Sequence, residues 1–455
     1  MPPETAAGVS HSNTSIPIPR IQKLIYGSGD WGRASFNSLR QIFYAIFLTD
    51  VVGLEARLAS FAALIAILWD AINDPLIGTL SDNVRSRWGR RRPFFLFFSV
   101  PFGLAFLVLW WAPPWENQIL LMITVALAYM LSDTIQTLVT VPYLALTPEI
   151  APDYDERTSL TSYRMFFNLA ASLTTVVTAP TIVDAAVKSG LSQQQGYLLV
   201  AGLFGILAVI PFMLLFFTIR EREAPPLENG EKIPLFNTIR LLWDNIPFRY
   251  VTIIYVINWI SFDVVAMMIP YYLLYWIADG DLLAKASVFG QKLSLESAAL
   301  GIIMLVATLS IPIWNLLSRR FSKRSAYIGG MTFWIVVQTL VFLLRPGQFD
   351  LILLFSFFAG FSVSTAHIMP EAIFPDVIDW DELRTRTRHE GMYYGAINFM
   401  RKLSSALAIF IALQVLGWFG YQNPPADALV FSQSSFTLLG IRLLTGPTVV
   451  LFLLA

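Results

Sequence analysis

The chain contains no cysteine and only three histidines in 455 residues. Without cysteine there are no disulfides, thiolate metal sites or cysteine nucleophiles. Charged residues are also scarce, at 14% of the sequence against roughly 25% in a soluble domain. Lysine plus arginine equals aspartate plus glutamate, at 31 each, so bulk charge gives no indication of a nucleic-acid partner. Residues 1–20 are polar and lack the basic-then-apolar pattern of a cleaved signal peptide.

Hydrophobic residues fill most of the sequence: they make up 56% of it, and the mean hydropathy is +0.61. A soluble chain of this size could not bury that much apolar surface. A bilayer-spanning helix needs about 20 mostly apolar residues, and lipid admits only helices or closed barrels. We therefore predict an all-α membrane protein with twelve transmembrane helices, at residues 27–48, 58–80, 93–112, 118–143, 160–187, 197–219, 250–277, 295–317, 325–344, 350–374, 392–419 and 434–455.

Lysine and arginine are distributed unevenly between the two sides of these helices. The N-terminal tail and the connections after even-numbered helices hold 21 of them, the opposite connections hold 5, and the other 5 lie within helices. Because cytoplasmic loops are enriched in these residues, the bias predicts that both termini are cytoplasmic. We expect a multi-pass protein of a cell membrane, and a bacterial inner membrane is the favoured location.

The connection at 220–249 is rich in proline and charge and divides the predicted helices six and six. It separates an N-terminal half, 1–219, from a C-terminal half, 250–455. Two six-helix halves around a central cavity are typical of a transporter that binds its substrate near the midplane of the membrane.

Two other function classes are disfavoured. The sequence has no HExxH, no GxSxG and no phosphate-cradling glycine loop, so we expect no enzyme and no cofactor besides a coupling ion. Charges within the membrane lie on several helices instead of forming one ring, which argues against a channel.

Asp70 and Asp74 lie four residues apart in the predicted helix 58–80, so they share one helix face. Two neighbouring carboxylates inside a membrane need a bound cation or a proton between them. Oxygen ligands suit Na⁺, and Asn73 adds a neutral oxygen nearby. The pair predicts a coupling-ion site. In the alternative interpretation the carboxylates only hold helices together by pairing with basic residues, although helix 58–80 contains no Lys or Arg.

Polar side chains recur at three- and four-residue spacing along the first predicted helix, which predicts one polar face toward the cavity. They are Tyr26, Asp30, Arg33, Asn37, Arg40 or Gln41, and Tyr44. Arg33 needs a counter-charge, which Asp30, Glu371, His367 or a carboxylate on the substrate could supply. The three-residue spacing favours the internal pair of Asp30 with Arg33.

Seven strings of residues resemble one known family. They are TDVVGL (49–54), WDAINDPLIG (69–78), RSRWGRRRPF (85–94), VPYLAL (141–146), DERTSLTSYRM (155–165), FPDVIDWDE (374–382) and EGMYYGAINFMRKL (390–403). The chain is similar to the glycoside–pentoside–hexuronide:cation symporters of the major facilitator superfamily. The resemblance implies a twelve-helix fold and sugar uptake coupled to Na⁺, H⁺ or Li⁺. Relatives of this family move lysophospholipids, so an amphiphile remains the alternative substrate.

The resemblance also implies site residues. The family's cation ligands match Asp70, Asp74 and Thr137, and its sugar-binding carboxylate matches Asp30. The remaining candidate substrate-binding residues are Arg33, Asn37, Thr140, Arg164, His367, Glu371 and Lys402. Three of these depart from the family pattern: Thr140 replaces a carboxylate, His367 replaces a tryptophan, and Arg164 matches an arginine only with a one-residue shift. The specific sugar therefore cannot be carried over, and the added Arg33 and Arg40 keep an anionic sugar open.

His367 and Glu371 share a face of the predicted helix 350–374. They could form a proton-linked site, a substrate clamp or a purely structural pair. Arg401, beside Lys402, is interpreted as reaching for the membrane interface.

The loop between helices 2 and 3 resembles the signature loop of the superfamily. We expect it, and the acid–base clusters after helices 4 and 10, to act as gates; the candidate residues are Asp82, Arg87, Arg90, Asp155, Arg157, Asp379 and Arg384.

These observations together predict a secondary transporter that couples Na⁺ or H⁺ to the symport of a sugar or glycoside by alternating access. The expected partners are the sugar, the coupling cation and the lipid bilayer, with no nucleic acid, and the expected state is a monomer.

Overall fold

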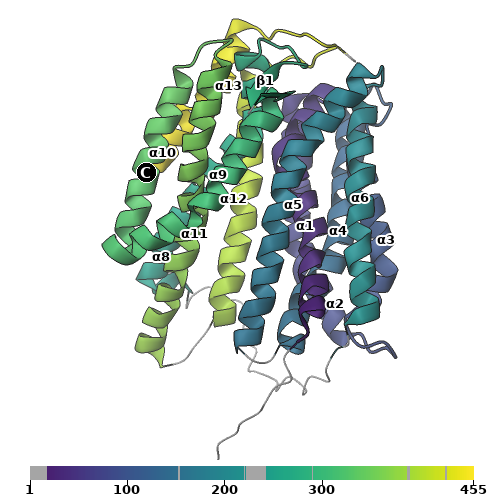
Figure 1. Ribbon diagram of the computed structural model, residues 1–455, viewed down its shortest axis with the longest axis vertical. Coiled ribbons are helices and arrows are strands. Elements are labelled where there is room, and N and C mark those ends of the chain that lie inside the picture. The colour runs from purple at the N-terminus through teal and green to yellow at the C-terminus, as the bar shows by residue number, and fades with distance from the viewer. Residues whose placement is uncertain are drawn as a thin grey trace, which may run out of the picture.

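The computed structural model describes residues 18–151, 154–219, 221, 242–288, 290–386, 390–425 and 428–454. Long helices stand side by side in two groups, with the N-terminal helices on the right of Figure 1 and the C-terminal helices on the left. Within the described residues, 11 helical spans are long and apolar enough to cross a membrane. The first helix is equally long, but its polar face makes it less apolar.

The N-terminal group comprises α1 (Arg20–Ile46), η1 (Phe47–Val51), α2 (Ala56–Asn83), α3 (Arg92–Leu109), α4 (Gln118–Ile150), α5 (Tyr154–Lys188) and α6 (Gln193–Thr218). The C-terminal group comprises α8 (Ile246–Tyr271), η2 (Tyr272–Ile277), β1 (Lys285–Val288), β2 (Gln291–Ser294), α9 (Leu295–Phe321), α10 (Lys323–Phe342), α11 (Phe349–Thr385), α12 (Glu390–Trp418), α13 (Ser435–Thr445) and α14 (Pro447–Leu454). Most of the predicted linker 220–249 lies outside the described residues.

The helix positions agree with the predicted ones, with three kinds of difference. The predicted last helix, 434–455, is divided at Gly446 into α13 and α14. Helices α4, α5 and α11 extend by several residues beyond the apolar runs, because a helix satisfies its own backbone hydrogen bonds and can continue into water. The antiparallel hairpin β1–β2, in which Lys285 pairs with Ser294, was not predicted. It lies at the end of the molecule opposite the Arg85–Arg92 loop. We call these the Asp50 end (top of Figure 1) and the Arg-rich end (bottom).

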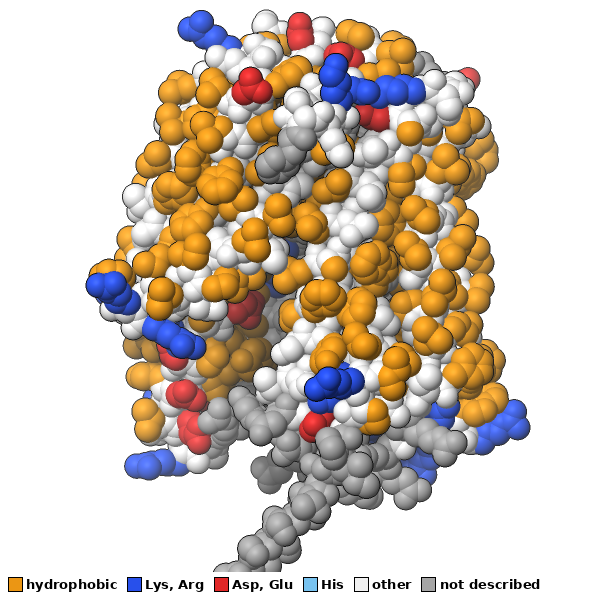
Figure 2. Space-filling view, viewed as in Figure 1, with side chains coloured by type: hydrophobic (Ala, Val, Ile, Leu, Met, Phe, Trp, Pro, Cys, Tyr) orange, Lys and Arg blue, Asp and Glu red, His pale blue; other side chains and the backbone are white. Residues whose placement is uncertain are grey.

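Small residues bring helices of the N-terminal group into close contact. A Cβ atom added at Gly103 of α3 would lie 3.0 Å from the carbonyl oxygen of Gly205, and one added at Gly205 of α6 would lie 2.6 Å from that of Gly103. Close backbone approach at small residues is the usual way in which membrane helices pack. Large apolar side chains cover the outer surface, as Figure 2 shows, and this surface suits lipid.

Candidate functional site

A cavity of about 490 Å³ lies between the two groups of helices. Figure 2 shows the surface hollowed between the groups, toward the Arg-rich end, with charged side chains visible inside. The wall is formed by α1, α2, α4, α8 and α12. It contains Arg33, Asn37, Arg40, Gln41, Ile67, Asp70, Asp74, Tyr129, Asp133, Gln136, Thr137, Thr140, Val141, Leu144, Asp263, Met267, Arg401, Lys402, Ser405 and Ile409.

Lys402 on α12 bridges the two carboxylates of α2. Its Nζ lies 2.9 Å from Asp70 Oδ2 and 2.6 Å from Asp74 Oδ2. Thr137 on α4 donates to Asp74 Oδ1 at 3.1 Å. The basic partner that helix 2 itself lacks therefore comes from the other half of the chain. The ammonium occupies the space between the carboxylates, where a coupling cation was expected.

Asn73 does not join this cluster in the present conformation. Its side chain is buried, it is not part of the cavity wall, and its Nδ2 has no partner among the described residues. The role of Asn73 as an ion ligand therefore stays a prediction that this conformation does not display. The physical reason is the helix period, because Asn73 directly precedes Asp74 and neighbouring side chains on a helix point about 100° apart.

Asp30 has a different place from the predicted one. It is fully buried and is not part of the described cavity wall. Its Oδ1 accepts from Arg33 Nε at 2.6 Å, as the spacing predicted, and its Oδ2 accepts from Arg164 Nε at 2.8 Å. Both oxygens are thus occupied by arginines. In this conformation Arg33, and not Asp30, faces the cavity.

Two further ion pairs in the wall were missed by the sequence analysis. Arg40 Nη1 lies 2.6 Å from Asp133 Oδ1 on α4. Arg401 lies 2.7 Å from Asp263 Oδ2 on α8, and its guanidinium stacks 3.8 Å from the Trp259 ring centroid. The interpretation of Arg401 as reaching for the membrane interface is therefore wrong, because a carboxylate and an aromatic face hold it inside. The available signal was a lone carboxylate in an apolar helix, which is by default functional or paired.

His367 and Glu371 share a face of α11 but have different partners. Tyr255 donates to Glu371 at 3.0 Å, whereas the His367 ring packs edge-on against Trp259 and Phe262. Neither lines the described cavity wall. Thr140 does line it, and its buried hydroxyl has no partner among the described residues. Thr140 is therefore available to a ligand.

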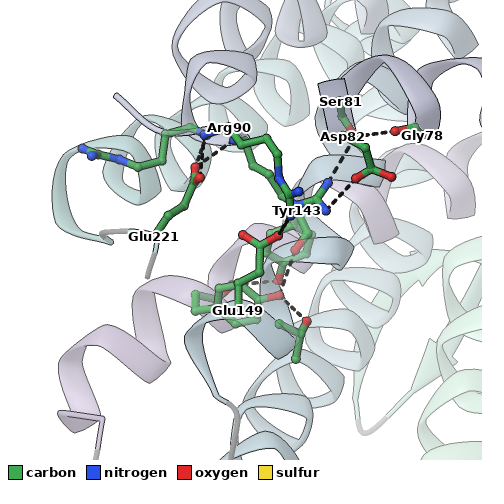
Figure 3. Close-up of polar contacts among 11 residues, drawn as sticks. Gly78, Ser81, Asp82, Arg90, Tyr143, Glu149 and Glu221 are labelled. Carbon is green, nitrogen blue, oxygen red and sulfur yellow. Dashed lines mark hydrogen bonds and ion pairs between the residues drawn. The ribbon is translucent and has the colours of Figure 1, made fainter. Parts of the chain in front are cut away.

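The signature-like loop forms a network within the N-terminal half, shown in Figure 3. Asp82 accepts from Arg91 at 2.9 Å, and Glu149 at the end of α4 accepts from Arg90 at 2.6 Å and from Arg91 at 2.8 Å. Arg87 was expected in this network, but it stacks on Trp88 instead. The cationic partner of Asp82 is thus the neighbouring Arg91.

Glu221 caps the start of α3, as Figure 3 also shows. Its carboxylate accepts from the backbone N–H groups of Arg90, Arg91 and Arg92 at 2.6 to 2.8 Å. Free N–H groups and the helix dipole make such a helix start favourable for a carboxylate. Gly89, at φ 108°, permits this contact, because an added Cβ would lie 2.7 Å from the Glu221 carboxylate.

The other candidate gate residues are dispersed. Arg157 donates to the Ala151 carbonyl at 3.4 Å, and Arg384 donates to the Asp244 carbonyl at 2.9 Å within the C-terminal half. The side chain of Asp155 lies outside the described residues. Asp379 lies on the exposed part of α11 near the Arg-rich end. Their action as gates between the halves stays a prediction.

Asp50 joins the two halves at the opposite end. Tyr275 of η2 and Tyr421, which follows α12, both donate to its carboxylate, and Thr49 donates at 2.7 Å. Thr49 also contacts the Tyr271 hydroxyl at 2.8 Å. Asp50 lies beyond the first predicted span, in the π-helical turn η1. These contacts hold the Asp50 end closed in this conformation.

Desolvation raises the pKa of Asp50 to about 6, although the hydroxyl donors favour the ionised form. If this end opens, hydration returns the pKa toward its ordinary value of 3.8. Protonation therefore favours the closed end. That stabilisation is complete below pH 4 and is lost as the pH rises through about 6.

We expect the closed-to-open ratio at the Asp50 end to be roughly tenfold higher at pH 5 than at pH 7.5. Leu191 and Leu429 are exposed and line one crevice there, from opposite halves. Spin labels attached to Leu191→Cys and Leu429→Cys report the distance between the two halves at this end. The chain has no native cysteine that would have to be replaced first. Asp50→Asn should remove the pH effect. The same pH effect in Asp50→Asn would assign it to another group, such as the neighbouring Asp184 or Glu296.

Comparison with known proteins gives one matching family and several relatives. The family model described as MFS/sugar transport protein matches residues 25–455. A provisionally named sulfoquinovose importer of Salmonella typhimurium is 26% identical over 95% of this chain and 87% of its own. The sodium-dependent lysophosphatidylcholine symporter 1-A of Danio rerio is 26% identical over 84% of this chain and 74% of its own.

Among solved structures, a bacterial homolog of the human lysosomal transporter Spinster superposes with a TM-score of 0.66 at 13% identity. The alignment covers 95% of this chain and 93% of that one. This likeness confirms the predicted all-α membrane fold.

Proposed function

Since this chain belongs to the MFS/sugar transport protein family, we propose that it takes up a sugar-like substrate together with a coupling cation, Na⁺ or H⁺. The protein is a secondary transporter of the membrane and not an enzyme. The relatives named above are a sulfoquinovose importer and a lysophosphatidylcholine symporter, and both names describe movement of a small molecule.

The observation that carries the proposal is the position of Lys402. Its ammonium comes from the C-terminal half and bridges two carboxylates of the N-terminal half, Asp70 and Asp74. A cation that binds these carboxylates competes with the ammonium and weakens a contact between the halves. Ion binding therefore has a differential effect on the two conformations, and this difference is what coupling requires.

The proposed orientation follows the charge distribution. The Arg-rich end faces the cytoplasm, so the hollow in Figure 2 opens inward and the Asp50 end is closed toward the outside. In this orientation α1 begins at the cytoplasmic end. The proposed setting is the inner membrane of a bacterium, with the single chain as the transporting unit, because the described cavity is formed within one chain.

The polar wall suits a hydroxyl-rich substrate. Asn37, Gln41, Gln136 and Thr140 supply amide and hydroxyl groups, and Arg33 adds a cation. An anionic sugar fits this set and has a precedent in the relative named as a sulfoquinovose importer. Apolar side chains along α4 and α12 also line the wall. A lysophospholipid is therefore the second candidate, supported by the Danio rerio relative.

Uptake into vesicles that contain the purified chain tests the proposal. We expect a labelled hexuronide or sulfosugar to accumulate when an inward Na⁺ or proton gradient is imposed, and to equilibrate when the gradient is absent. Vesicles with Asp74→Asn serve as the matched control. Accumulation of lysophosphatidylcholine alone would select the second candidate, and gradient-independent entry of every compound would contradict symport.

A further inference from the structure

The carboxylate of Asp133 is buried in the cavity wall with one oxygen unused. The residue is 2% exposed. Arg40 Nη1 donates to Oδ1 at 2.6 Å, whereas Oδ2 has no hydrogen-bond partner among the described residues. A buried polar atom without a partner costs free energy unless a ligand supplies the missing contact. Asp133 lies four residues before Thr137, so both side chains lie on the same face of α4.

The Asp133 carboxyl group is also a direct neighbour of the Asp70 carboxyl on α2, within hydrogen-bonding reach. Two ionised carboxylates accept and cannot donate, so their contact requires a positive charge or a proton between them. Among the described residues, Lys402 pairs with Asp70 and Arg40 pairs with Asp133, but neither pairs with both. The position between the two carboxyl groups is therefore not filled by a side chain.

The local charges do not balance. Asp70, Asp74 and Asp133 carry three negative charges when ionised, and Lys402 and Arg40 carry two positive ones. The remaining pair in this wall, Arg401 with Asp263, is neutral by itself. One monovalent cation, or one proton shared by Asp70 and Asp133, therefore completes the balance. Carboxylate and hydroxyl oxygens are hard ligands, which suit a small alkali cation.

We propose that Asp133 and Asp70 form a cation position on α2 and α4 that takes Na⁺ or Li⁺ beside the carboxylates held by Lys402. The position rests on the proposed cation coupling and deepens it, because nothing predicted Asp133 as a ligand. A cation can enter there while Lys402 still bridges Asp70 and Asp74. Its charge then weakens the hold of Asp70 on the ammonium, so that release of Lys402 follows binding.

Binding of radioactive Na⁺ to the purified full-length chain in lipid nanodiscs tests the position. We expect Asp133→Asn to raise the Na⁺ dissociation constant roughly tenfold or more, because one charged ligand is lost. Asp376→Asn is the comparison variant: it also removes the carboxylate of an ion pair, with Lys323 at 2.8 Å, but Asp376 lies outside the described cavity wall. Its effect on Na⁺ affinity should stay within about twofold, since it adds no ligand to the site. Equal Na⁺ affinity in Asp133→Asn and wild type would overturn the proposal.

A second variant controls for the possibility that Asp133→Asn loses Na⁺ binding because it misfolds. Asp133→Asn together with Arg40→Gln removes the ion pair as a unit, so no guanidinium is left without its carboxylate. The loss of Na⁺ affinity should persist in this double variant. Unchanged affinity there, with binding lost in Asp74→Asn, would overturn the Asp133 position alone. Absence of Na⁺ and Li⁺ binding in wild type would also overturn it, and uptake in a proton gradient would then decide the proposed function separately.

Discussion

Replacing Asp74 with asparagine should abolish accumulation of the substrate against its gradient. The internal-to-external ratio should fall to about one, because the variant can bind and exchange substrate but no longer gains from the ion gradient. Asp74 carries this expectation because its two oxygens contact both Lys402 of the opposite half and Thr137 of its own half. Asp70→Asn should act in the same way through its contact with Lys402.

The measurement is concentrative uptake beside counterflow exchange in the same vesicles. Asp376→Asn provides the control, since Asp376 is an exposed carboxylate that pairs with Lys323 at 2.8 Å. Exposed ion pairs contribute little, so this variant should accumulate substrate as the wild type does. Full accumulation by both Asp70→Asn and Asp74→Asn would show that coupling does not run through α2.

The fold was predictable to within a few residues at many helix ends, because lipid restricts spanning segments to long apolar helices. The polar face of α1 was also predictable, since three- and four-residue spacing alone places Asp30 and Arg33 together. The hairpin Lys285–Ser294 was not, because two four-residue strands in a polar loop carry no long pattern. Periodicity therefore accounts for what lies on one helix.

Most contacts between helices that are distant in the sequence could not be predicted from it. Nothing in the spacing of residues on α2 indicates that Lys402, more than 300 positions later, is the partner of Asp74. Glu149 and Glu221 were missed for the same reason, because their partners Arg90 and Arg91 come from another loop. Asp133 and Asp263 could have been noticed as lone carboxylates in apolar helices. Their pairing with Arg40 and Arg401 required the packed structure.

The Asp30 cluster changes what the sequence implied about the substrate. Asp30 is fully buried and holds two arginines, so removing its charge leaves Arg33 and Arg164 without a carboxylate. Losing one partner of a buried ion pair costs about 3–5 kcal/mol. Asp30→Asn should therefore destabilise the fold, and this loss would obscure any effect on sugar hydroxyls. The informative residue is Arg33, because Asp30 keeps Arg164 when Arg33 is removed.

The cluster also has one positive charge in excess, from two arginines and one aspartate. Only the Nε atom of Arg33 contacts Asp30, and within the described residues no hydrogen bond reaches its terminal amino groups. The side chain of Arg33 lines the cavity. The excess therefore lies where a substrate binds, and an anionic group on that substrate would neutralise it. With the proposed cation on α2 and α4, the loaded cavity would be neutral as a whole.

Arg33→Ala should accordingly lose anionic substrates selectively. A charged hydrogen bond contributes about 1.5–3 kcal/mol, so affinity for a uronide or a sulfosugar should fall roughly 10- to 150-fold. Affinity for the matching neutral glycoside should stay unchanged or rise. Competition binding with the two sugars and lysophosphatidylcholine measures the difference, and Arg33→Lys, which keeps the charge, should retain much of the preference. Equal loss of neutral and anionic sugars in Arg33→Ala would show that Arg33 serves Asp30 and not the substrate, because damage to the shared ion pair cannot distinguish between ligands.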